Sequence, residues 1–396
     1  MSTPDRVDGQ VTIRIDLAAI RHNMARVRAV SKSKILAIVR ADAFGHGVQK
    51  ILPALGDADA LGVSSVSAAV ALRHRGEQRT IVVLHGFKSN GEITECASHS
   101  LTPVIHNRDQ LEMLKERAQP GLKCWAQFDT GCGWTGLRSS QAAQVYRKLD
   151  NAGVVVECIM TDLESAHRSN DISTDRQLRI FRSLRWNAPV QRSAANSAAL
   201  LTRVDSHYDW VRPGLMLYGA SPFTADSVSG FGTSVGSGNG SGSVTDRHFG
   251  LQPAMRVTAP VVAIRDFQTS ERIGGSTVKP LRKPTRVAFV RAGFADGYPR
   301  MPPDQGSVML GNRACAILGQ VTMELMAVDV TSLTVPPPID FPVTLWGHAQ
   351  LRVDDVANLA EVDPHELLCR IRGTRTWSDA PTGGVNVRDI GNHRIV

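Results

Sequence analysis

The chain has 396 residues, 42% hydrophobic and 21% charged, which is the composition of a folded globular protein and enough length for two or three domains. It has no run of about 18 apolar residues, the length that a membrane-spanning helix needs, and its polar start argues against a secretion signal. The net charge is +8, but the basic residues are dispersed rather than clustered with aromatic side chains. Neither a membrane nor a nucleic acid is therefore expected as a partner.

The six cysteines are scattered along the chain, and none forms a Cys-x-x-Cys pair. A zinc knuckle or a thioredoxin-like redox motif is therefore not expected, and no metal site is predicted. Scattered cysteines in a long chain are typical of free thiols in a reducing compartment. The sequence thus predicts a cytoplasmic protein.

Short apolar runs alternate with helical patterns between Val11 and Gly219. The apolar runs predict strands at Ile35–Val39, Leu61–Val66, Ile81–Leu84, Trp125–Phe128 and Val154–Thr161. Strands that alternate with helices form parallel sheets, and about eight such units over this length fit a closed (β/α)8 barrel of the TIM type. An open, doubly wound sheet is the alternative.

A stretch rich in glycine and serine follows at residues 229–243, where eleven of fifteen residues are Gly or Ser. Such a stretch buries too little apolar surface to pack, so it predicts a flexible linker. After Leu251, closely spaced apolar runs separated by turn signals predict a compact β domain, and residues 354–371 predict one or two helices. The predicted domains are a barrel at 11–228, the linker, and a mostly-β domain with a terminal helical segment at 244–396.

Residues 35–47, ILAIVRADAFGHG, form an apolar strand followed by a polar, glycine-rich turn. In a (β/α)8 barrel the residues after a strand lie at the mouth, where such barrels hold their active sites. The segment resembles the pyridoxal-phosphate lysine motif of the alanine racemase family. Further segments resemble this family in the family's order: VTIRIDLAAIRHN, FDTGCGWTGLR, SAANSAAL, WVRPGLMLYG, AGFADGYPR, LGQVTMELMAVDVT and HELLCRIRGTR. The resemblance covers about residues 11–377.

The resemblance implies a fold-type III barrel that uses pyridoxal phosphate (PLP), followed by a β domain. It also implies a homodimer paired head to tail. In that dimer the mouth of the active site is shared between the barrel of one chain and the C-terminal domain of the other, and it takes a small-molecule substrate.

Two residues depart from the family at its most reactive positions. Arg40 stands where the resemblance places the lysine that holds the cofactor as a Schiff base and acts as one racemising base. A guanidinium stays charged and is not an amine nucleophile, so it cannot do this. Phe294 stands where the resemblance places the tyrosine that is the opposite base, and phenylalanine has no titratable proton. These residues predict no covalently held PLP, and PLP binding of any kind is not the expected outcome.

Other positions around the implied cofactor divide into changed and unchanged residues. The changed ones are Phe44, Gln127, Trp134, Asp162, Glu324 (which follows Met323) and Gly373. The unchanged ones are Asn196, Ser197, Arg212, Gly214 and Leu215. In the resemblance Arg212 meets the pyridine nitrogen, and the Gly214–Leu215 backbone lies near the phosphate. Trp134 and Phe294 make the mouth more apolar, which favours a substrate larger than alanine.

The candidate catalytic residues are Arg40, His46, Asp162 and Glu164. The candidate substrate- or cofactor-binding residues are Asp42, Phe44, Trp134, Asn196, Ser197, Arg212, Gly214, Leu215, Tyr218, Phe294, Met323 and Glu324. The Arg40 guanidinium can hold a carboxylate or phosphate with two parallel hydrogen bonds. Asp162 and Glu164 share a face if their strand continues, and paired carboxylates can divide acid and base work. His46 is a further candidate base.

The missing bases favour a repurposed, PLP-independent enzyme that does not racemise alanine. Such an enzyme would act by acid–base chemistry at the barrel mouth, on a small or medium-sized biosynthetic intermediate of secondary metabolism. One alternative is a binding or scaffold protein without catalysis. A second alternative is an amino-acid racemase or isomerase that binds PLP in an atypical way.

Deleting residues 229–243 should leave the fold largely intact, because the entropy of loop closure depends only weakly on loop length. Thermal unfolding of the shortened chain, followed by circular dichroism, is expected near the wild-type melting temperature. A large drop in melting temperature would show that the segment packs against the rest of the protein.

Overall fold

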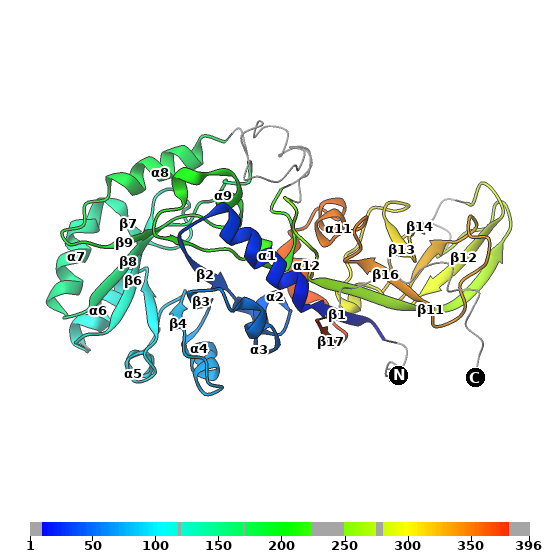
Figure 1. Cartoon of the computed structure of the whole chain (residues 1–396). Coiled ribbons are helices and arrows are strands. Elements are labelled where there is room, and N and C mark those ends of the chain that lie inside the picture. Colours follow the sequence, from blue (N-terminus) through cyan, green and yellow to red (C-terminus); the bar gives the residue numbers. More distant parts are fainter. Residues whose placement is uncertain (1–9, 118–119, 169–170, 224–248, 275–279, 380–396) are drawn as a thin grey trace. The chain divides into compact units, whose positions relative to one another are not determined.

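The computed structural model describes residues 10–117, 120–168, 171–223, 249–274 and 280–379. These residues form two compact units, which Figure 1 shows coloured along the sequence. The first unit runs from Arg21 to Leu217 and includes a short stretch after Ser221. The second unit holds the N-terminal strand, Tyr218–Ala220 and the chain from Gln252 onward. The predicted linker at 229–243 lies outside the described residues.

The first unit is a closed barrel of eight parallel strands. Its strands are β2 (Lys34–Ile38), β3 (Ala60–Val63), β4 (Thr80–Val83), β5 (Thr102–Ile105), β6 (Lys123–Asp129), β8 (Val155–Met160), β9 (Gln191–Ser193) and β10 (Trp210–Val211). Neighbours run in the order β5-β4-β3-β2-β10-β9-β8-β6, and β5 pairs with β6 to close the ring. A further short strand, β7 (Leu137–Arg138), pairs with β6. The closed barrel is confirmed, and the β5–β6 pairing excludes the open sheet.

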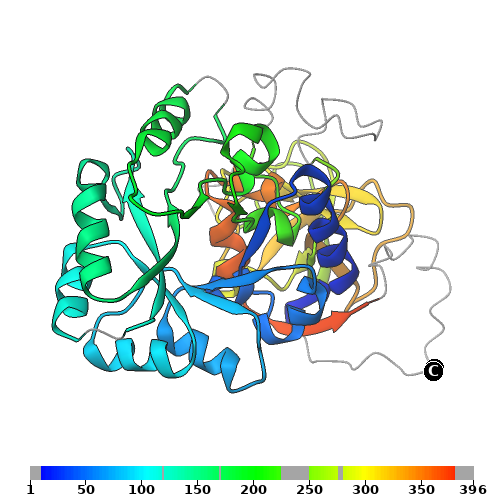
Figure 2. The ribbon, with the colours of Figure 1, turned by 60° about the vertical axis from the view of Figure 1, so that its left-hand side comes forward.

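Helices follow the strands and surround them, as Figures 1 and 2 show. They are α1 (Leu17–Val30), α2 (Arg40–Phe44), α3 (Val48–Ile51), α4 (Val66–Arg73), α5 (Asn90–Ser98), α6 (Arg108–Glu116), α7 (Ala142–Asn151), α8 (Ser173–Ser183) and α9 (Ser197–Thr202). Short 3-10 turns are η1 (Leu52–Leu55), η2 (Ser139–Gln141), η3 (Val204–Ser206) and η4 (Leu215–Tyr218). The side chains of Ser65, Ser89 and Asn107 cap α4, α5 and α6 by accepting hydrogen bonds from first-turn N–H groups.

The barrel strands carry apolar side chains on both faces. Every residue of β3 and β5 is buried, as are the four residues of β2 after Lys34. Parallel strands in such barrels are enclosed on both sides, so their sequences are continuous apolar runs rather than alternating ones. This is why the apolar runs in the sequence located most of the strands.

The second unit is mostly β. Its strands are β1 (Thr12–Asp16), β11 (Met255–Phe267), β12 (Thr285–Val290), β13 (Ser307–Leu310), β14 (Arg313–Leu318), β15 (Met326–Asp329), β16 (Pro342–Trp346) and β17 (Thr374–Ser378). They pair in the order β12-β15-β14-β13-β16-β11-β1-β17, and β11 also pairs with β12. The unit also holds a 3-10 turn, η6 (Phe294–Asp296), and the helices α11 (Val353–Leu359) and α12 (Pro364–Arg370). The predicted mostly-β domain is confirmed, and the helices α11 and α12 lie where residues 354–371 predicted one or two helices.

The N-terminal strand β1 belongs to this second sheet. Thr12 pairs with Thr258 of β11 on one side and with Thr374 of β17 on the other. The sequence analysis placed this strand in the barrel domain because it precedes the first barrel helix. Pairing between residues more than two hundred positions apart leaves no local signal, so pattern analysis could not find it.

Two further observations concern a membrane and a metal ion. None of the described helices is long and apolar enough to cross a membrane. No group of three or more His, Cys, Asp or Glu side chains among the same residues could hold a metal ion.

Candidate active site at the barrel mouth

The turn after β2 has an unusual backbone. Ala41, Asp42, Ala43 and Phe44 all have positive φ, between 51° and 56°. This makes α2 a left-handed turn, which costs roughly 1–2 kcal/mol for each residue that carries a Cβ. Strain of this size persists only where surrounding contacts hold it, and it concentrates at functional sites. The turn therefore marks the carboxyl end of β2 as a candidate site.

His46 holds this turn from inside the protein. Its side chain is fully buried, and Nδ1 lies 3.0 Å from the Ala43 carbonyl oxygen and 2.9 Å from that of Phe44. The Asp42 carboxylate accepts a hydrogen bond from the Val48 backbone N–H at 2.9 Å. Both side chains thus fix the backbone that presents Arg40. His46, proposed from the sequence as a base, is positioned here as a support for the turn.

Arg40 is exposed just after β2. The structure places it near His85, a residue that the sequence analysis did not single out. His85 follows β4, and its backbone oxygen accepts hydrogen bonds from His106 Nε2 (3.0 Å) and Gln110 Nε2 (3.1 Å). Partial burial, followed by the positive charge of Arg40 and by His106, lowers the pKa of His85. A histidine with a lowered pKa is neutral near pH 7 and can accept a proton. Its position after a predicted barrel strand was the available sequence signal.

Arg212 lies after β10 and is only 5% exposed. Its Nη1 donates to Ser193 Oγ, and its Nη2 donates to the Thr161 carbonyl and to Asp162 Oδ1, each at 2.7 Å. The other oxygen of Asp162 accepts a hydrogen bond from Gln127 Nε2 at 3.0 Å. A buried guanidinium needs a compensating charge, and Asp162 supplies it. Asp162 and Gln127 therefore form one network with Arg212.

Asp162 and Glu164 do not form the expected strand-face pair. Strand β8 ends at Met160, so both residues lie in the loop that follows. Asp162 Oδ1 and Oδ2 are already bound by Arg212 and Gln127. The Glu164 backbone N–H binds Gln177, and its side chain is exposed. Trp134, another candidate, is 87% exposed and so forms no part of a packed pocket wall within this chain.

A cradle of backbone N–H groups surrounds Ser197. Ser197 Oγ accepts hydrogen bonds from the N–H groups of Gly214 (2.9 Å) and Met216 (3.4 Å). A Cβ at Gly214 would lie 3.3 Å from the Phe44 ring, so glycine keeps this approach open. The neighbouring Asn196 caps α9 by accepting from the Ala199 N–H at 3.0 Å. Because both N–H groups are bonded to Ser197 Oγ, the hydroxyl proton of Ser197 is the donor in this cradle that a phosphate group could accept.

Two further candidates near this cradle are buried. Leu215 is 3% exposed and Tyr218 is 1% exposed. Their side chains therefore pack within the protein, and only the backbone at Leu215 can serve a ligand.

The remaining candidates meet in the second unit. Phe294 N–H donates to the Thr322 carbonyl (3.1 Å), and Ala295 N–H donates to the Met323 carbonyl (2.9 Å). These bonds join the loop that carries Phe294 to the loop of Met323 and Glu324. Phe294 is 37% exposed and Met323 is 60% exposed. Phe294 and Met323 therefore form a small exposed apolar patch. Such patches are a feature of surfaces that bind another molecule.

Two protein-family models match most of the chain. Residues 15–222 match the family described as "Alanine racemase, N-terminal domain", and residues 254–377 match "Alanine racemase, C-terminal domain". The chain belongs to the alanine racemase family. An alanine racemase of Thioalkalivibrio sulfidiphilus is 37% identical over 366 residues, covering 91% of this chain and 96% of that protein. The biosynthetic alanine racemase of Escherichia coli is 32% identical over 364 residues, with the same coverage.

Solved structures agree with this assignment. Biosynthetic alanine racemase from Pseudomonas aeruginosa has a TM-score of 0.82 and 31% identity, covering 93% of this chain and 99% of that one. Alanine racemase from Acinetobacter baumannii has a TM-score of 0.81 and 31% identity, covering 93% and 100%. The more distant alanine racemase from Bartonella henselae, at 23% identity, holds covalently bound PLP.

These relatives correct the function that the sequence analysis favoured. A PLP-independent enzyme of secondary metabolism is wrong, because relatives covering nine-tenths of the chain are alanine racemases. The expectation that no covalently held cofactor is involved is contradicted by the same relationship to alanine racemases over both domains. Arg40 and Phe294 are two changed positions in a chain that matches the family over both domains.

In this member of the alanine racemase family the residues at the barrel mouth can be compared with the phosphate, the ring nitrogen and the aldehyde of PLP. The Ser197 hydroxyl can donate to a phosphate, while the Gly214 and Met216 N–H groups are bonded to its oxygen. The Arg212 guanidinium, held by Ser193, Thr161 and Asp162, stands where the resemblance places the partner of the ring nitrogen. Arg40 does not fit the aldehyde, because a guanidinium does not condense with it as a lysine amine does.

Replacing Ala41 by glycine should stabilise the protein by about 0.5–1 kcal/mol, because the left-handed backbone no longer carries a Cβ. The matched control is Ala68→Gly on the exposed side of α4. There the same substitution should destabilise by a similar amount, because the backbone is an ordinary helix. Urea unfolding measures both. Destabilisation by both substitutions would contradict the left-handed turn.

Arg40→Gln should raise the pKa of His85, because removing a nearby positive charge makes protonation of the imidazole easier. An NMR titration of the imidazole signals measures the shift, with His85→Gln to assign the resonance. Arg28→Gln, which removes an arginine paired with Asp59 elsewhere, is the control and should leave the titration unchanged. An unchanged His85 titration in Arg40→Gln would place the two side chains apart.

Proposed function

We propose that this protein binds PLP at the carboxyl end of its barrel and acts as an amino-acid racemase, with alanine as the first substrate to test. The single observation that carries the proposal is the cradle of Ser197, Gly214 and Met216 beside the buried Arg212. Its support from outside the chain is the relationship over both domains to proteins named alanine racemase.

The proposal includes a divergence from the family. Arg40 and Phe294 occupy the positions where the resemblance places the cofactor lysine and the catalytic tyrosine. The protein would therefore be an amino-acid racemase that departs from the family's pattern at these two positions.

PLP, when bound, supplies an electron sink that makes the proton on the α-carbon of an amino acid easier to remove. The protein's own residues do the rest. The Ser197 hydroxyl, whose oxygen accepts from the Gly214 N–H, would donate its proton to the phosphate, and Arg212 would orient the ring. The Arg40 guanidinium binds the carboxylate of an amino acid through two parallel hydrogen bonds. His85 accepts a proton at a ring nitrogen, since its lowered pKa keeps it neutral near pH 7.

The proposal also extends to a second copy of the chain. In the head-to-tail homodimer that the resemblance implies, Phe294, Met323 and Glu324 of one copy border the barrel mouth of the other. Two exposed apolar side chains, Phe294 and Met323, support this, because such groups favour burial at an interface. A cytoplasmic location and domain bounds of 11–228 and 244–396 also remain parts of the proposal.

Added PLP should bind the purified chain at about one molecule per subunit, and Ser197→Ala should weaken binding by about tenfold or more, because it removes a hydrogen-bonding group from a phosphate dianion. Equilibrium dialysis with absorbance detection measures the affinity. Ser183→Ala, at an exposed helix end, is the matched control and should bind PLP normally. Formation of D-alanine from L-alanine is then followed with and without PLP.

Borohydride reduction and peptide mass spectrometry test the divergence in the same samples. Arg40→Lys should yield a reduced PLP adduct at residue 40, because it restores an amine there. Absence of PLP binding by the unmodified chain, at millimolar cofactor, would contradict the proposed function.

A further inference from the structure

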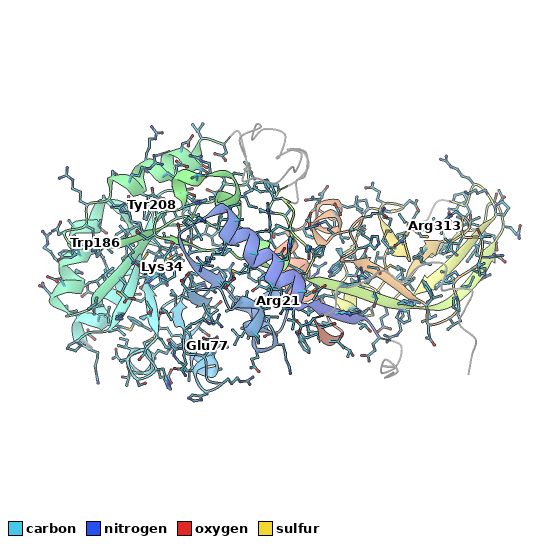
Figure 3. The ribbon with its side chains drawn as sticks, viewed as in Figure 1. Arg21, Lys34, Glu77, Trp186, Tyr208 and Arg313 are labelled. Carbon is cyan, nitrogen blue, oxygen red and sulfur yellow. The ribbon has the colours of Figure 1, made fainter. Side chains whose placement is uncertain are left out.

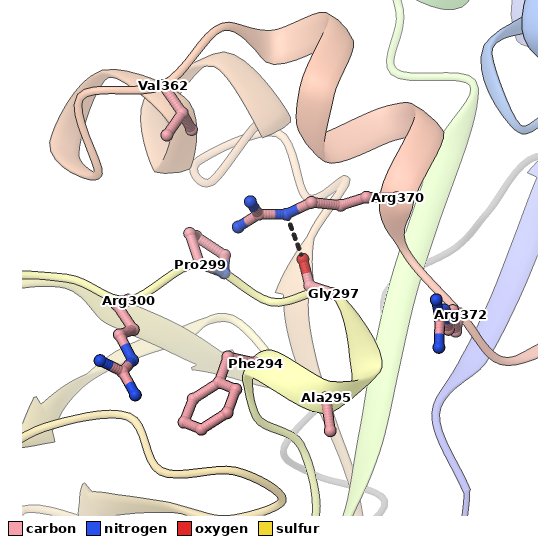
Figure 4. Close-up of a pocket in the computed structure, with 8 residues that line it drawn as sticks. All are labelled: Phe294, Ala295, Gly297, Pro299, Arg300, Val362, Arg370 and Arg372. Carbon is pink, nitrogen blue, oxygen red and sulfur yellow. Dashed lines mark hydrogen bonds between the residues drawn. The ribbon is translucent and has the colours of Figure 1, made fainter.

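The pocket of about 650 Å³ in Figure 4 is lined by Phe294, which the proposed function places against a second copy of the chain. The pocket therefore belongs to that interface and adds no separate site. A different feature lies in the barrel. One buried glutamine, Gln110, joins the loops that follow β4 and β5.

Gln110 lies in the first turn of α6, and only 1% of its surface is exposed. Its Oε1 accepts a hydrogen bond from the His106 backbone N–H at 2.8 Å. Its Nε2 donates to the carbonyl oxygens of His85 at 3.1 Å and of Phe87 at 3.2 Å. The oxygen and both hydrogens of the amide are thus bonded. These three bonds tie the loop after β4 to the loop after β5.

Gly86, directly after His85, allows the amide to come this close. Its φ is +61°, and a Cβ there would lie 2.4 Å from both Gln110 Nε2 and the Val104 carbonyl oxygen. A larger residue would therefore push the amide away from the His85 carbonyl. On the other side, the His85 N–H donates to the Ser64 carbonyl at 3.3 Å. The backbone of His85 is thus held through both its N–H and its carbonyl.

His106 supplies a second donor to the His85 carbonyl. Its Nε2 lies 3.0 Å from that oxygen, and a carbonyl oxygen only accepts, so this nitrogen carries a hydrogen. Gln110 Nε2 lies 3.4 Å from the same ring nitrogen, where two donors meet without a bond between them. The His85 carbonyl is therefore the point at which both side chains act.

The strands β2 and β4 begin near Lys34 and Glu77, which Figure 3 labels, and they end before Arg40 and His85. Arg40 and His85 therefore lie at the same end of the barrel. Partial burial, then the charge of Arg40 and then His106 lower the pKa of His85. The His85 side chain is exposed, so its place beside Arg40 depends on how its backbone is held.

We propose that Gln110 is a positioning residue, whose buried amide fixes the backbone of His85 so that the imidazole stays beside Arg40. The proposal rests on the proposed function, in which His85 accepts a proton and Arg40 binds a carboxylate. A base must lie within hydrogen-bond reach of the proton that it accepts. A displacement of about 1 Å can lower a rate by about 100-fold. Because Gln110 is buried, it acts through His85.

An NMR titration of the His85 imidazole, in the full-length chain without added ligand, tests this role. Gln110→Met keeps the length of the side chain and removes the amide. The imidazole is then no longer held beside Arg40, so the pKa of His85 should rise towards its ordinary range. In an Arg40→Gln background the same substitution should raise this pKa less, because the charge is already gone. Gln110→Asn, whose amide is one methylene too short to reach both loops, should also raise it.

The matched control is Gln177→Met. Gln177 is another buried glutamine that holds a barrel loop, since its amide donates to the Asp162 carbonyl at 2.8 Å and accepts from the Glu164 N–H at 3.2 Å. Its replacement should destabilise the protein much as Gln110→Met does, which urea unfolding measures, but should leave the His85 titration unchanged. Equal shifts of the His85 pKa in both variants would overturn the proposal.

The racemase assay separates this role from the proposed function. With PLP added, Gln110→Met should lower kcat for L-alanine by about tenfold and change KM by less than about twofold, because Arg40 still binds the carboxylate. An unchanged kcat, or an unchanged His85 titration in Gln110→Met and Gln110→Asn, would overturn the positioning role and leave the racemase function intact. A shifted titration in a protein that neither binds PLP nor forms D-alanine would contradict the proposed function and leave the hold of Gln110 on His85 standing.

Discussion

The buried guanidinium of Arg212 organises the candidate active site. Arg212 follows β10, and it binds the Thr161 carbonyl after β8, Ser193 in β9 and the Ala194 carbonyl after β9. It therefore joins the carboxyl ends of three neighbouring strands. A buried positive charge without a partner would destabilise the barrel, so the Asp162 carboxylate is held against it at 2.7 Å. The same pair sets the electrostatics of the place where a cofactor ring would lie.

The left-handed turn after β2 brings Arg40 to the same end of the barrel. His46 supports that turn through the contacts of its Nδ1 with the Ala43 and Phe44 carbonyls. The exposed ends of β2 and β4 then offer Arg40 and His85 instead. The site is thus divided between a buried, hydrogen-bonded part around Ser197 and an exposed, charged part around Arg40.

Two positions with reactive residues in the family are changed in this chain, although both of its domains match the family. Arg40 and Phe294 are read directly from the sequence, and the chemistry that they preclude at those positions is certain. What they do not determine is whether the whole site has changed its ligand. The family models match both domains in spite of these two changes, so the chain belongs to the family.

The sequence by itself determined the order of the elements. Buried parallel strands are continuous apolar runs. The strands β2, β3, β4, β6 and β8 could therefore be located from such runs in the sequence. The resemblance to the family marked Arg40, Ser197 and Arg212 as candidate site residues. Only the tertiary structure decided that Asp162 binds Arg212 rather than pairing with Glu164, that His85 lies near Arg40, and that β1 joins the C-terminal sheet. These contacts join residues 45 or more apart, or depend on where a strand ends, and neither leaves a local pattern in the sequence.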